Sequence, residues 1–312
     1  MQTCTARPLY GAIEGGGTKF VCAIARAPAE ILDSVTISTA APAATLADCV
    51  RFFQAAEQNH GAISAFGIGC FGPIDLRVGS PRFGRMMPTP KQGWSGVDIL
   101  APLTRVFTAP IVLDTDVGAA ALAEWRLGAG RHAGSLVYVT VGTGIGGAAV
   151  PVDLAATRLM HAEMGHLPVR RDPRDLDFGG VCPFHGDCVE GLASGPAIRA
   201  RWGAKLESLP AEHAAWSIIG GYLGQLAAAI TLMLSAERIV FGGGVMANGA
   251  LLPHVHNATH QYLNNYVEPL RSRERVEEYI CAPALGNSAG VLGAILLAMN
   301  AVRSKEACNA PD

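Results

Sequence analysis

The segment from residue 161 to residue 195, HAEMGHLPVRRDPRDLDFGGVCPFHGDCVEGLASG, is rich in residue types that bind metal ions. Two imidazoles and two thiols have spacings that suit one tetrahedral zinc ion, and four protein ligands make a closed, usually structural site. They are His166, Cys182, His185 and Cys188. Carboxylates flank the set at Glu163 and Glu190, so we expect the segment to hold a polar substrate in one pose.

Two alternatives remain open for this segment. Free cysteines are often buried in ordinary cores, so the thiols could be core residues and the histidines surface residues. The segment is polar and has little apolar periodicity with which to bury thiols, which favours the metal site. His161 competes with His166 for the first ligand position, and spacing alone does not decide between them.

A glycine cluster near the N-terminus, Glu14 to Lys19, lies between two predicted strands. Glycines let backbone N–H groups converge on an anion without side-chain clash. Thr18 adds a hydroxyl donor, and Lys19 could add a positive charge. Glu14 could hold a hydrated magnesium ion, because that ion keeps several waters and binds few carboxylates. A plain hairpin turn is the alternative.

Two further glycine clusters follow predicted strands, Gly142-Thr143-Gly144 after SLVYVTV and Gly242-Gly243-Gly244 after RIVF. The pattern G-x-G-x-x-G occurs twice, starting at Gly67 and at Gly142. A dinucleotide site requires a helix to open at the last glycines. Pro73 follows the first pattern and a predicted strand follows the second, so we reject that interpretation for both.

Two aspartates, Asp114 and Asp116, end the predicted strand PIVLDTD and precede an alanine-rich helix. A helix N-terminus stabilises an ionised carboxylate, although aspartate is also a preferred capping residue. Ligands bind at the carboxyl ends of strands in open α/β sheets. An ionised aspartate there could accept the proton of an alcohol as a phosphoryl group arrives.

The composition narrows the class of protein. A chain of 312 residues suggests two domains, or one domain with a large lobe. The net charge of -2 gives no electrostatic reason to expect nucleic acid. We expect no apolar run long enough to span a bilayer and find no secretion signal in MQTCTARPLY. Outside the metal segment the cysteines are scattered, so we expect reduced thiols in the cytoplasm.

Short buried strands and helices alternate along the chain, which predicts an α/β fold. Strands are predicted at 9–14, 18–25, 30–38, 65–71, 110–116, 135–141 and 238–241. Helices are predicted at 43–58, 118–128, 214–234 and 286–300. Strand–glycine turn–strand units near residues 14 and 144 indicate two lobes of related build.

The motifs EGGGTK, DTDVGAAALAE, GTGIGG, EMGH with CPFHGDC, and FGGGV occur in this order. Over residues 9–298 their order resembles the ROK family of sugar kinases, which has the two-lobed actin-like ATPase (ribonuclease H-like) fold. Glu14, the Cys-x-x-His-x-x-Cys run, and segments 71–75 and 89–94 look most like bacterial ROK fructokinases.

The resemblance implies an N-terminal α/β lobe over residues 1–115, completed by a C-terminal helix over about 290–312. A larger lobe would span residues 116–289 and contain the zinc loop at 161–190. It also implies phosphorylation of a hexose by ATP, with D-fructose becoming fructose 6-phosphate. Mannose, glucose or an N-acetylated amino sugar are alternative acceptors. An alternative function is that of a non-catalytic sugar sensor. The implied cofactors are ATP, Mg2+ and a structural Zn2+. The protein would be a cytoplasmic homodimer without nucleic acid or membrane partners.

The resemblance also implies roles for single residues. Asp116 aligns with the catalytic base, and Glu163, His166 and Glu190 align with residues that hold the sugar, with Gly72 and Thr115 also placed on the sugar side. Zinc on one nitrogen of His166 would fix the tautomer of the other, which would face the sugar. The expected ATP-binding residues are Gly15, Gly16, Gly17, Thr18, Lys19, Gly142, Thr143, Gly144, Gly242, Gly243, Gly244 and Val245.

One position departs from the family pattern. The family usually has Asn two residues after the base, where this chain has Gly118. The missing amide removes a donor and an acceptor from the sugar pocket. A site that hydrogen-bonds a hydroxyl discriminates strongly, so we expect a looser or altered choice of sugar. DNA-binding relatives carry a helix-turn-helix before the first strand, and the eight residues before Leu9 are too few for one.

Overall fold

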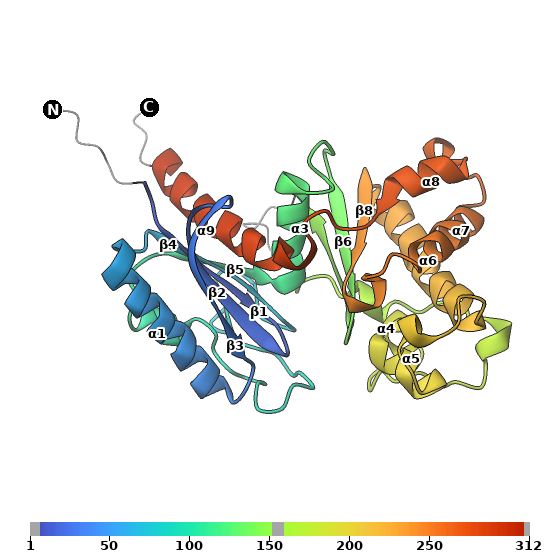
Figure 1. The fold of residues 1–312 in the computed structure, drawn as a ribbon, viewed down its shortest axis with the longest axis horizontal. Helices are drawn as coiled ribbons and strands as arrows, with labels where there is room; N and C mark the ends of the chain where they lie inside the picture. The colour runs from blue at the N-terminus through green and yellow to red at the C-terminus, as the bar shows by residue number, and fades with distance from the viewer. Residues whose placement is uncertain (1–6, 152–158, 309–312) are drawn as a thin grey trace. The chain divides into compact units, whose positions relative to one another are not determined.

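The computed structural model describes residues 7–151 and 159–308 and divides the chain into two compact units (Figure 1). Unit 1 comprises residues 1–123, 153–161 and 287–312, and unit 2 comprises residues 124–152 and 162–286. Each unit contains one β-sheet and a hydrophobic core of its own. The predicted α/β class is therefore confirmed.

Unit 1 is built on a five-stranded sheet of order β3-β2-β1-β4-β5. Its first three strands form an antiparallel meander, and the last two run parallel to β1. The strands are β1 (Tyr10–Gly15), β2 (Lys19–Ala27), β3 (Glu30–Ser38), β4 (Ala65–Cys70) and β5 (Ile111–Thr115). The helices are α1 (Pro42–His60), α2 (Ala101–Thr104), α3 (Asp116–Leu127), which continues into unit 2, and α9 (Ala289–Cys308).

The strand β4, between β1 and β5, is buried at every position, as expected of a strand covered on both faces. On one face, Phe53 of α1 meets Phe66 of β4 edge-to-face, with ring centroids 5.0 Å apart. On the other face, a Cβ at Gly67 would lie 1.9 Å from the carbonyl oxygen of Ala294 in α9. The glycine therefore allows α9 to pack directly on the strand (Figure 1).

Unit 2 is built on a four-stranded sheet of order β7-β6-β8-β9. The strands are β6 (Leu136–Val141), β7 (Ile145–Val150), β8 (Arg238–Gly242) and β9 (Ile280–Cys281). The helices are α4 (Val189–Ala193), α5 (Gly195–Trp202), α6 (Ala214–Leu234), α7 (Leu252–Leu263) and α8 (Arg273–Tyr279). Short 3-10 helices occur at Met164–His166, Pro173–Asp175, Leu206–Ser208, Gly244–Met246, Glu268–Leu270 and Gly286–Ser288.

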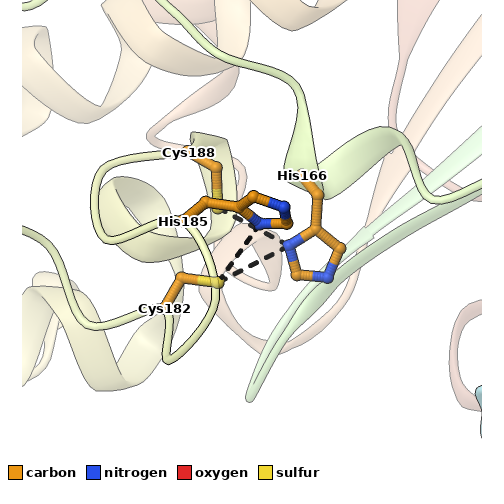
Figure 2. Close-up of side chains that lie close together, drawn as sticks. All are labelled: His166, Cys182, His185 and Cys188. Carbon is orange, nitrogen blue, oxygen red and sulfur yellow. Dashed lines mark hydrogen bonds between the residues drawn. The ribbon is translucent and has the colours of Figure 1, made fainter.

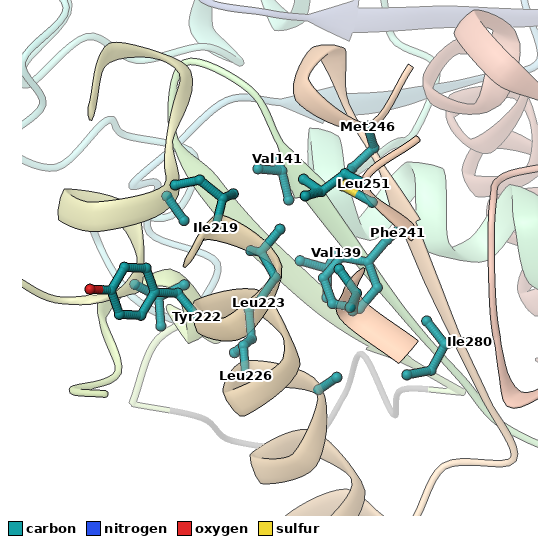
Figure 3. Packing of buried hydrophobic residues seen from close by; sticks show 14 of the residues in the cluster. Val139, Val141, Ile219, Tyr222, Leu223, Leu226, Phe241, Met246, Leu251 and Ile280 are labelled. Atoms are coloured by element: carbon teal, nitrogen blue, oxygen red, sulfur yellow. The ribbon is translucent and has the colours of Figure 1, made fainter. Parts of the chain in front are cut away.

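The long helix α6 forms the centre of the unit 2 core (Figure 3). Ile219, Leu223 and Leu226 are spaced to share one helix face, and they pack in one cluster with Val139 and Phe241 of the sheet. With 21 residues and a hydropathy of 1.6, α6 is long and apolar enough to cross a membrane. The expectation that no run reaches this length is therefore wrong. In the most apolar 18-residue stretch of α6, 61% of the residues are buried, as in a core helix.

Candidate functional site

Asp116 opens α3 directly after β5, at the carboxyl edge of the unit 1 sheet. Burial raises the pKa of Asp116 to about 6. The N–H of Val117, which donates to Oδ1 at 2.9 Å, opposes this rise in pKa, and the neighbouring Asp114 adds to it. An aspartate that is ionised at neutral pH but more basic than usual suits proton abstraction.

The second aspartate, Asp114, occupies the space beside Gly118. Its Oδ1 accepts the N–H of Thr115 at 2.7 Å. A Cβ built on Gly118 would lie 2.6 Å from the carboxyl atoms of Asp114. Any side chain at residue 118 would therefore have to displace that carboxyl group. Thr115 is buried, and its hydroxyl accepts the N–H of Gly118 at 2.9 Å.

The first glycine cluster forms a tight turn between β1 and β2. The N–H of Gly16 donates to the carbonyl of Lys19 at 2.8 Å, and the hydroxyl of Thr39 donates to the carbonyl of Gly16 at 2.8 Å. Gly17, Thr18 and Lys19 are exposed at its tip. Such a braced turn presents backbone to an incoming anion.

Glu14 has a structural role that the sequence did not indicate. Burial raises the pKa of Glu14, while Lys19 and the N–H of Val291, which the carboxylate accepts, lower it. A Cβ at Gly290 would lie 2.3 Å from the carboxyl carbon of Glu14. The carboxylate thus packs against the N-terminus of α9, where the helix dipole favours negative charge.

The second and third glycine clusters meet at a pocket in unit 2. Gly195 donates its N–H to the carbonyl of Gly142 at 2.8 Å, which joins the turn after β6 to the start of α5. The pocket has a volume of about 310 Å³, within the range of small-molecule sites. Its lining comprises Gly142, Thr143, Gly195, Ile198, Arg199, Lys205, Leu206, Glu207, Gly244 and Val245.

Four of the predicted ATP-binding residues line this pocket: Gly142, Thr143, Gly244 and Val245. Gly243 instead shapes the turn, because its φ is +90° and a Cβ there would lie 2.5 Å from the carbonyl of Val141. After Gly144 the chain enters β7, not a helix, which confirms the rejection of the dinucleotide motif.

The α5 residues of the pocket were missed from the sequence. Ser194 accepts the N–H of Ala197 and caps α5, and a proline occupies its first turn. This serine–glycine–proline run is a helix-start signal that could have predicted α5, although not its contact with the glycine turn.

The four predicted zinc ligands converge in one cluster (Figure 2). Nδ1 of His166 lies 3.7 Å from Sγ of Cys182 and 3.6 Å from Sγ of Cys188, and Nδ1 of His185 lies 3.6 Å from Sγ of Cys182. All four donor atoms lie within 4.8 Å of one another. Tetrahedral zinc with sulfur and nitrogen ligands separates its donors by roughly 3.5 Å, so the cluster fits zinc.

The local backbone explains how this cluster forms. Cys182 and Gly186 exchange two backbone hydrogen bonds, and Gly186 has a φ of +63° that favours glycine. Cys188 caps α4 through its sulfur, which accepts the N–H of Gly191 at 3.4 Å. Burial raises the pKa of the Cys188 thiol to about 11, so binding of a metal would release its proton.

The competing histidine lies elsewhere. Nε2 of His161 accepts the backbone N–H of Ile74 at 3.2 Å, and both residues belong to unit 1. The cluster in unit 2 contains His166. Of the two histidines that the spacing left open, His166 is the one that lies in the cluster.

Glu190 links the cluster to the second glycine turn. With Nδ1 of His166 directed at the thiols, Nε2 of the same ring lies 4.0 Å from Oε1 of Glu190. The other oxygen of Glu190 accepts the N–H of Ile145 at 2.8 Å. Glu163 precedes the short helix that carries His166, and its carbonyl accepts the N–H of that residue. These contacts place His166 and Glu190 side by side within unit 2.

A buried ion pair fastens the same segment at a second point. Asp175 lies 3.1 Å from Nε of Arg201 and accepts the hydroxyl of Tyr222 at 2.7 Å. The side chains of Asp175 and Arg201 are only 4% and 7% exposed. The guanidinium of Arg201 also stacks over Phe178, 4.1 Å from its ring centre. The sequence did not indicate this pairing, because its members are far apart along the chain.

The sequence model of the ROK family matches residues 10–301. The chain belongs to the ROK family. The fructokinase of Zymomonas mobilis is 43% identical over 299 residues, covering 95% of this chain and 98% of that protein. The fructokinase of Lactococcus lactis is 38% identical over 290 residues, covering 93% and 96%.

The crystal structure of a ROK hexokinase from Thermus thermophilus has a TM-score of 0.75 to this chain at 25% identity, covering 95% of this chain and 99% of that one. As a ROK protein, the chain therefore has the predicted α/β fold of the actin-like ATPases. In this ROK protein, Asp116 and the first glycine turn belong to unit 1. The metal cluster, Glu190 and the pocket belong to unit 2.

Proposed function

We propose that this protein transfers the γ-phosphoryl group of ATP to a hexose, and that the hexose is D-fructose, which becomes fructose 6-phosphate. One structural observation carries the phosphoryl transfer. Asp116 lies at the carboxyl edge of a sheet, and burial raises its pKa to about 6. Two relatives that are named fructokinase and align over nearly their whole length support fructose as the acceptor.

For ATP, we propose that the phosphates bind the turns at Gly15–Lys19 and Gly142–Gly144. The base and ribose would occupy the pocket of about 310 Å³, beside Gly244 and Val245. Mg2+ bound to the phosphates would neutralise their charge. Glu14 is the carboxylate proposed to hold this hydrated Mg2+. The contact of Glu14 with α9 limits how far its side chain can reach.

For the sugar, we propose that Glu163, His166 and Glu190 hydrogen-bond its hydroxyls, with Gly72 and Thr115 at the neighbouring strand ends. Zn2+ held by His166, Cys182, His185 and Cys188 would keep this segment ordered. Nε2 of His166 and Oε1 of Glu190, 4.0 Å apart, leave room for one hydroxyl to contact both.

In the proposed reaction, Asp116 takes the proton of a primary hydroxyl of the sugar. The hydroxyl oxygen attacks the γ-phosphorus in line, the bond to the bridging oxygen breaks, and ADP leaves. Phosphoryl transfer of this kind depends mainly on positioning and on stabilisation of charge. We also propose that the enzyme works in the cytoplasm as a homodimer, as is usual in the resembled family, without nucleic acid or membrane partners.

The test is ATP consumption with a panel of free hexoses: fructose, mannose, glucose, N-acetylglucosamine and N-acetylmannosamine. We expect the highest kcat/KM with fructose and a product phosphorylated at the 6-position. A higher kcat/KM with another hexose would show that this hexose, and not fructose, is the preferred substrate. Sugar binding without sugar-dependent ATP consumption would identify a sugar sensor and contradict the proposal.

A further inference from the structure

His161 is fitted closely against the backbone that follows β4. Its Nε2 accepts the N–H of Ile74 at 3.2 Å. A Cβ built on Gly72 would lie 3.2 Å from Nε2 and 3.3 Å from Cε1 of the ring. The imidazole therefore packs over Gly72 and satisfies a backbone donor two residues further on. It is an anchor between a loop and the end of a strand.

This anchor lies at the strand edge that carries Asp116. β4 and β5 are parallel neighbours, and Cys70 pairs with Thr115 at their ends. Gly72 follows Cys70 by two residues, and Asp116 follows Thr115 by one. Since parallel strands end at the same edge of a sheet, His161 is held at the edge where the proposed base lies.

His161 is also the last residue of its segment in unit 1, and Ala162 begins the return to unit 2. Two peptide links separate His161 from Glu163, so their Cα atoms lie at most about 7 Å apart. Five links separate His161 from His166, a reach of at most about 18 Å. Where His161 is held therefore limits where the proposed sugar-binding residues can be.

We propose that His161 is a positioning residue for the acceptor sugar. Its hydrogen bond to Ile74 fixes the point at which the sugar-binding segment begins, and so fixes how Glu163 meets the sugar. This inference rests on the proposed function, because it needs Glu163 to contact the acceptor. Loss of the anchor weakens sugar binding and leaves ATP binding unchanged, because the hydrogen bond between His161 and Ile74 includes none of the residues proposed to bind ATP.

Three variants separate the role of Nε2 from that of the ring as a whole. In His161→Gln, the amide oxygen stands as many bonds from Cα as Nε2 does, so it can accept the N–H of Ile74. In His161→Asn, the amide oxygen matches the position of Nδ1 and is too short to reach. His161→Ala removes both. Each variant is compared with the wild-type chain in steady-state kinetics with fructose and ATP.

We expect the fructose KM to rise about tenfold in His161→Ala and His161→Asn, as for the loss of one well-ordered hydrogen bond. In His161→Gln we expect a rise of no more than about twofold. The KM for ATP should stay within about twofold in all three. Zinc content and melting temperature are measured in parallel, because a purely structural role would lower stability without this split between the two KM values.

Either of two results with the variants would overturn the inference: an unchanged fructose KM in His161→Ala, or recovery by asparagine but not by glutamine. The second would assign the role to Nδ1. A wild-type chain that consumes no ATP with any hexose would be a different result. It would refute the proposed function itself, and the role of His161 would fall with it.

Discussion

The two units hold their functional residues by different means. In unit 1, the glycine turn follows β1 and Asp116 follows β5, and both strands are held in register by β4, which lies between them in one sheet. In unit 2, Glu163 and His166 lie on a segment with little regular structure, fastened by contacts within the Cys/His cluster and by Asp175. Residues placed by a sheet need no further support, whereas residues placed by a loop need cross-links.

The largest expected effect comes from the residue that the sheet places. In Asp116→Asn we expect kcat to fall about 10²–10⁴-fold, the usual contribution of a general base. Steady-state kinetics measure the fall, and calorimetric titration with the sugar shows that binding is intact. Near-normal turnover in this variant, with sugar still bound, would show that Asp116 is not the base.

The pH dependence should follow the same carboxyl group. Since the base must be ionised, kcat/KM should fall tenfold per unit below about pH 6. The folded pKa exceeds the unfolded value of about 4, so the folded chain loses stability as the pH rises from about 4 to about 6. Asp116→Asn should therefore melt higher than wild type at pH 8 and not at pH 4. An equal melting temperature at pH 8 would contradict this.

Removal of the proposed zinc ion tests whether metal binding holds the segment 161–190 in place. Structural zinc sites contribute on the order of 10 kcal/mol of apparent binding energy, which a chelator withdraws. We expect the sugar KM to rise more than about tenfold and backbone hydrogen exchange to increase across residues 161–190. Strands β1 to β5 should keep their protection, since the sheet register and the packing of α1 and α9 hold them without the metal. Fully active protein that contains no zinc would contradict the proposed zinc site.

The buried ion pair provides the second cross-link. Removing one partner leaves the other charge buried and unpaired, so Asp175→Asn should cost about 3–5 kcal/mol in the free energy of unfolding. The matched control is Glu277→Gln, which removes the exposed pair with Arg273 and should cost less than about 1 kcal/mol. Denaturant unfolding measures both. Equal losses in the two variants would show that burial does not matter here.

The smallest expected effect comes from Gly118. An asparagine there would push the carboxyl group of Asp114 aside, at a cost of about 1–3 kcal/mol for overpacking. We also expect it to change the ratio of kcat/KM between fructose and mannose, because it adds an amide at the proposed sugar side. Gly118→Ala is the control, since it adds bulk without an amide. If both variants change the ratio equally, displacement of Asp114 is the cause.

The sequence predicted best what depends on local pattern. The predominantly apolar segment of α6 predicted residues 214–234, the bounds that the structure shows. Another local pattern, a short apolar strand followed by an alanine-rich helix, placed Asp116 at the junction of β5 and α3. The convergence of His166, Cys182, His185 and Cys188 was also predicted, because a zinc site imposes a characteristic spacing on its ligands. In contrast, α7 and α8 were missed. In α7, two of the buried positions are polar, His256 and Thr259, so its buried face is hard to recognise from the sequence.

Contacts between distant parts of the chain could not be predicted. His161 and His166 have equally suitable spacings, and the structure separates them: His166 joins the Cys/His cluster, whereas His161 accepts the N–H of Ile74. The pairing of Asp175 with Arg201, and of Glu14 with the start of α9, brings together residues that no local pattern connects. For the proposed site, the sequence therefore named candidate residues but did not predict the contacts among them.

The docking of α9 on β4 has a consequence for how the chain is made. Unit 2 ends at residue 286, whereas unit 1 needs the helix that begins at Ala289. During synthesis from the N-terminus, the first sheet to emerge therefore waits for the last helix to leave the ribosome. The later unit can bury its core first, which reverses the usual N-to-C order in which nascent domains fold.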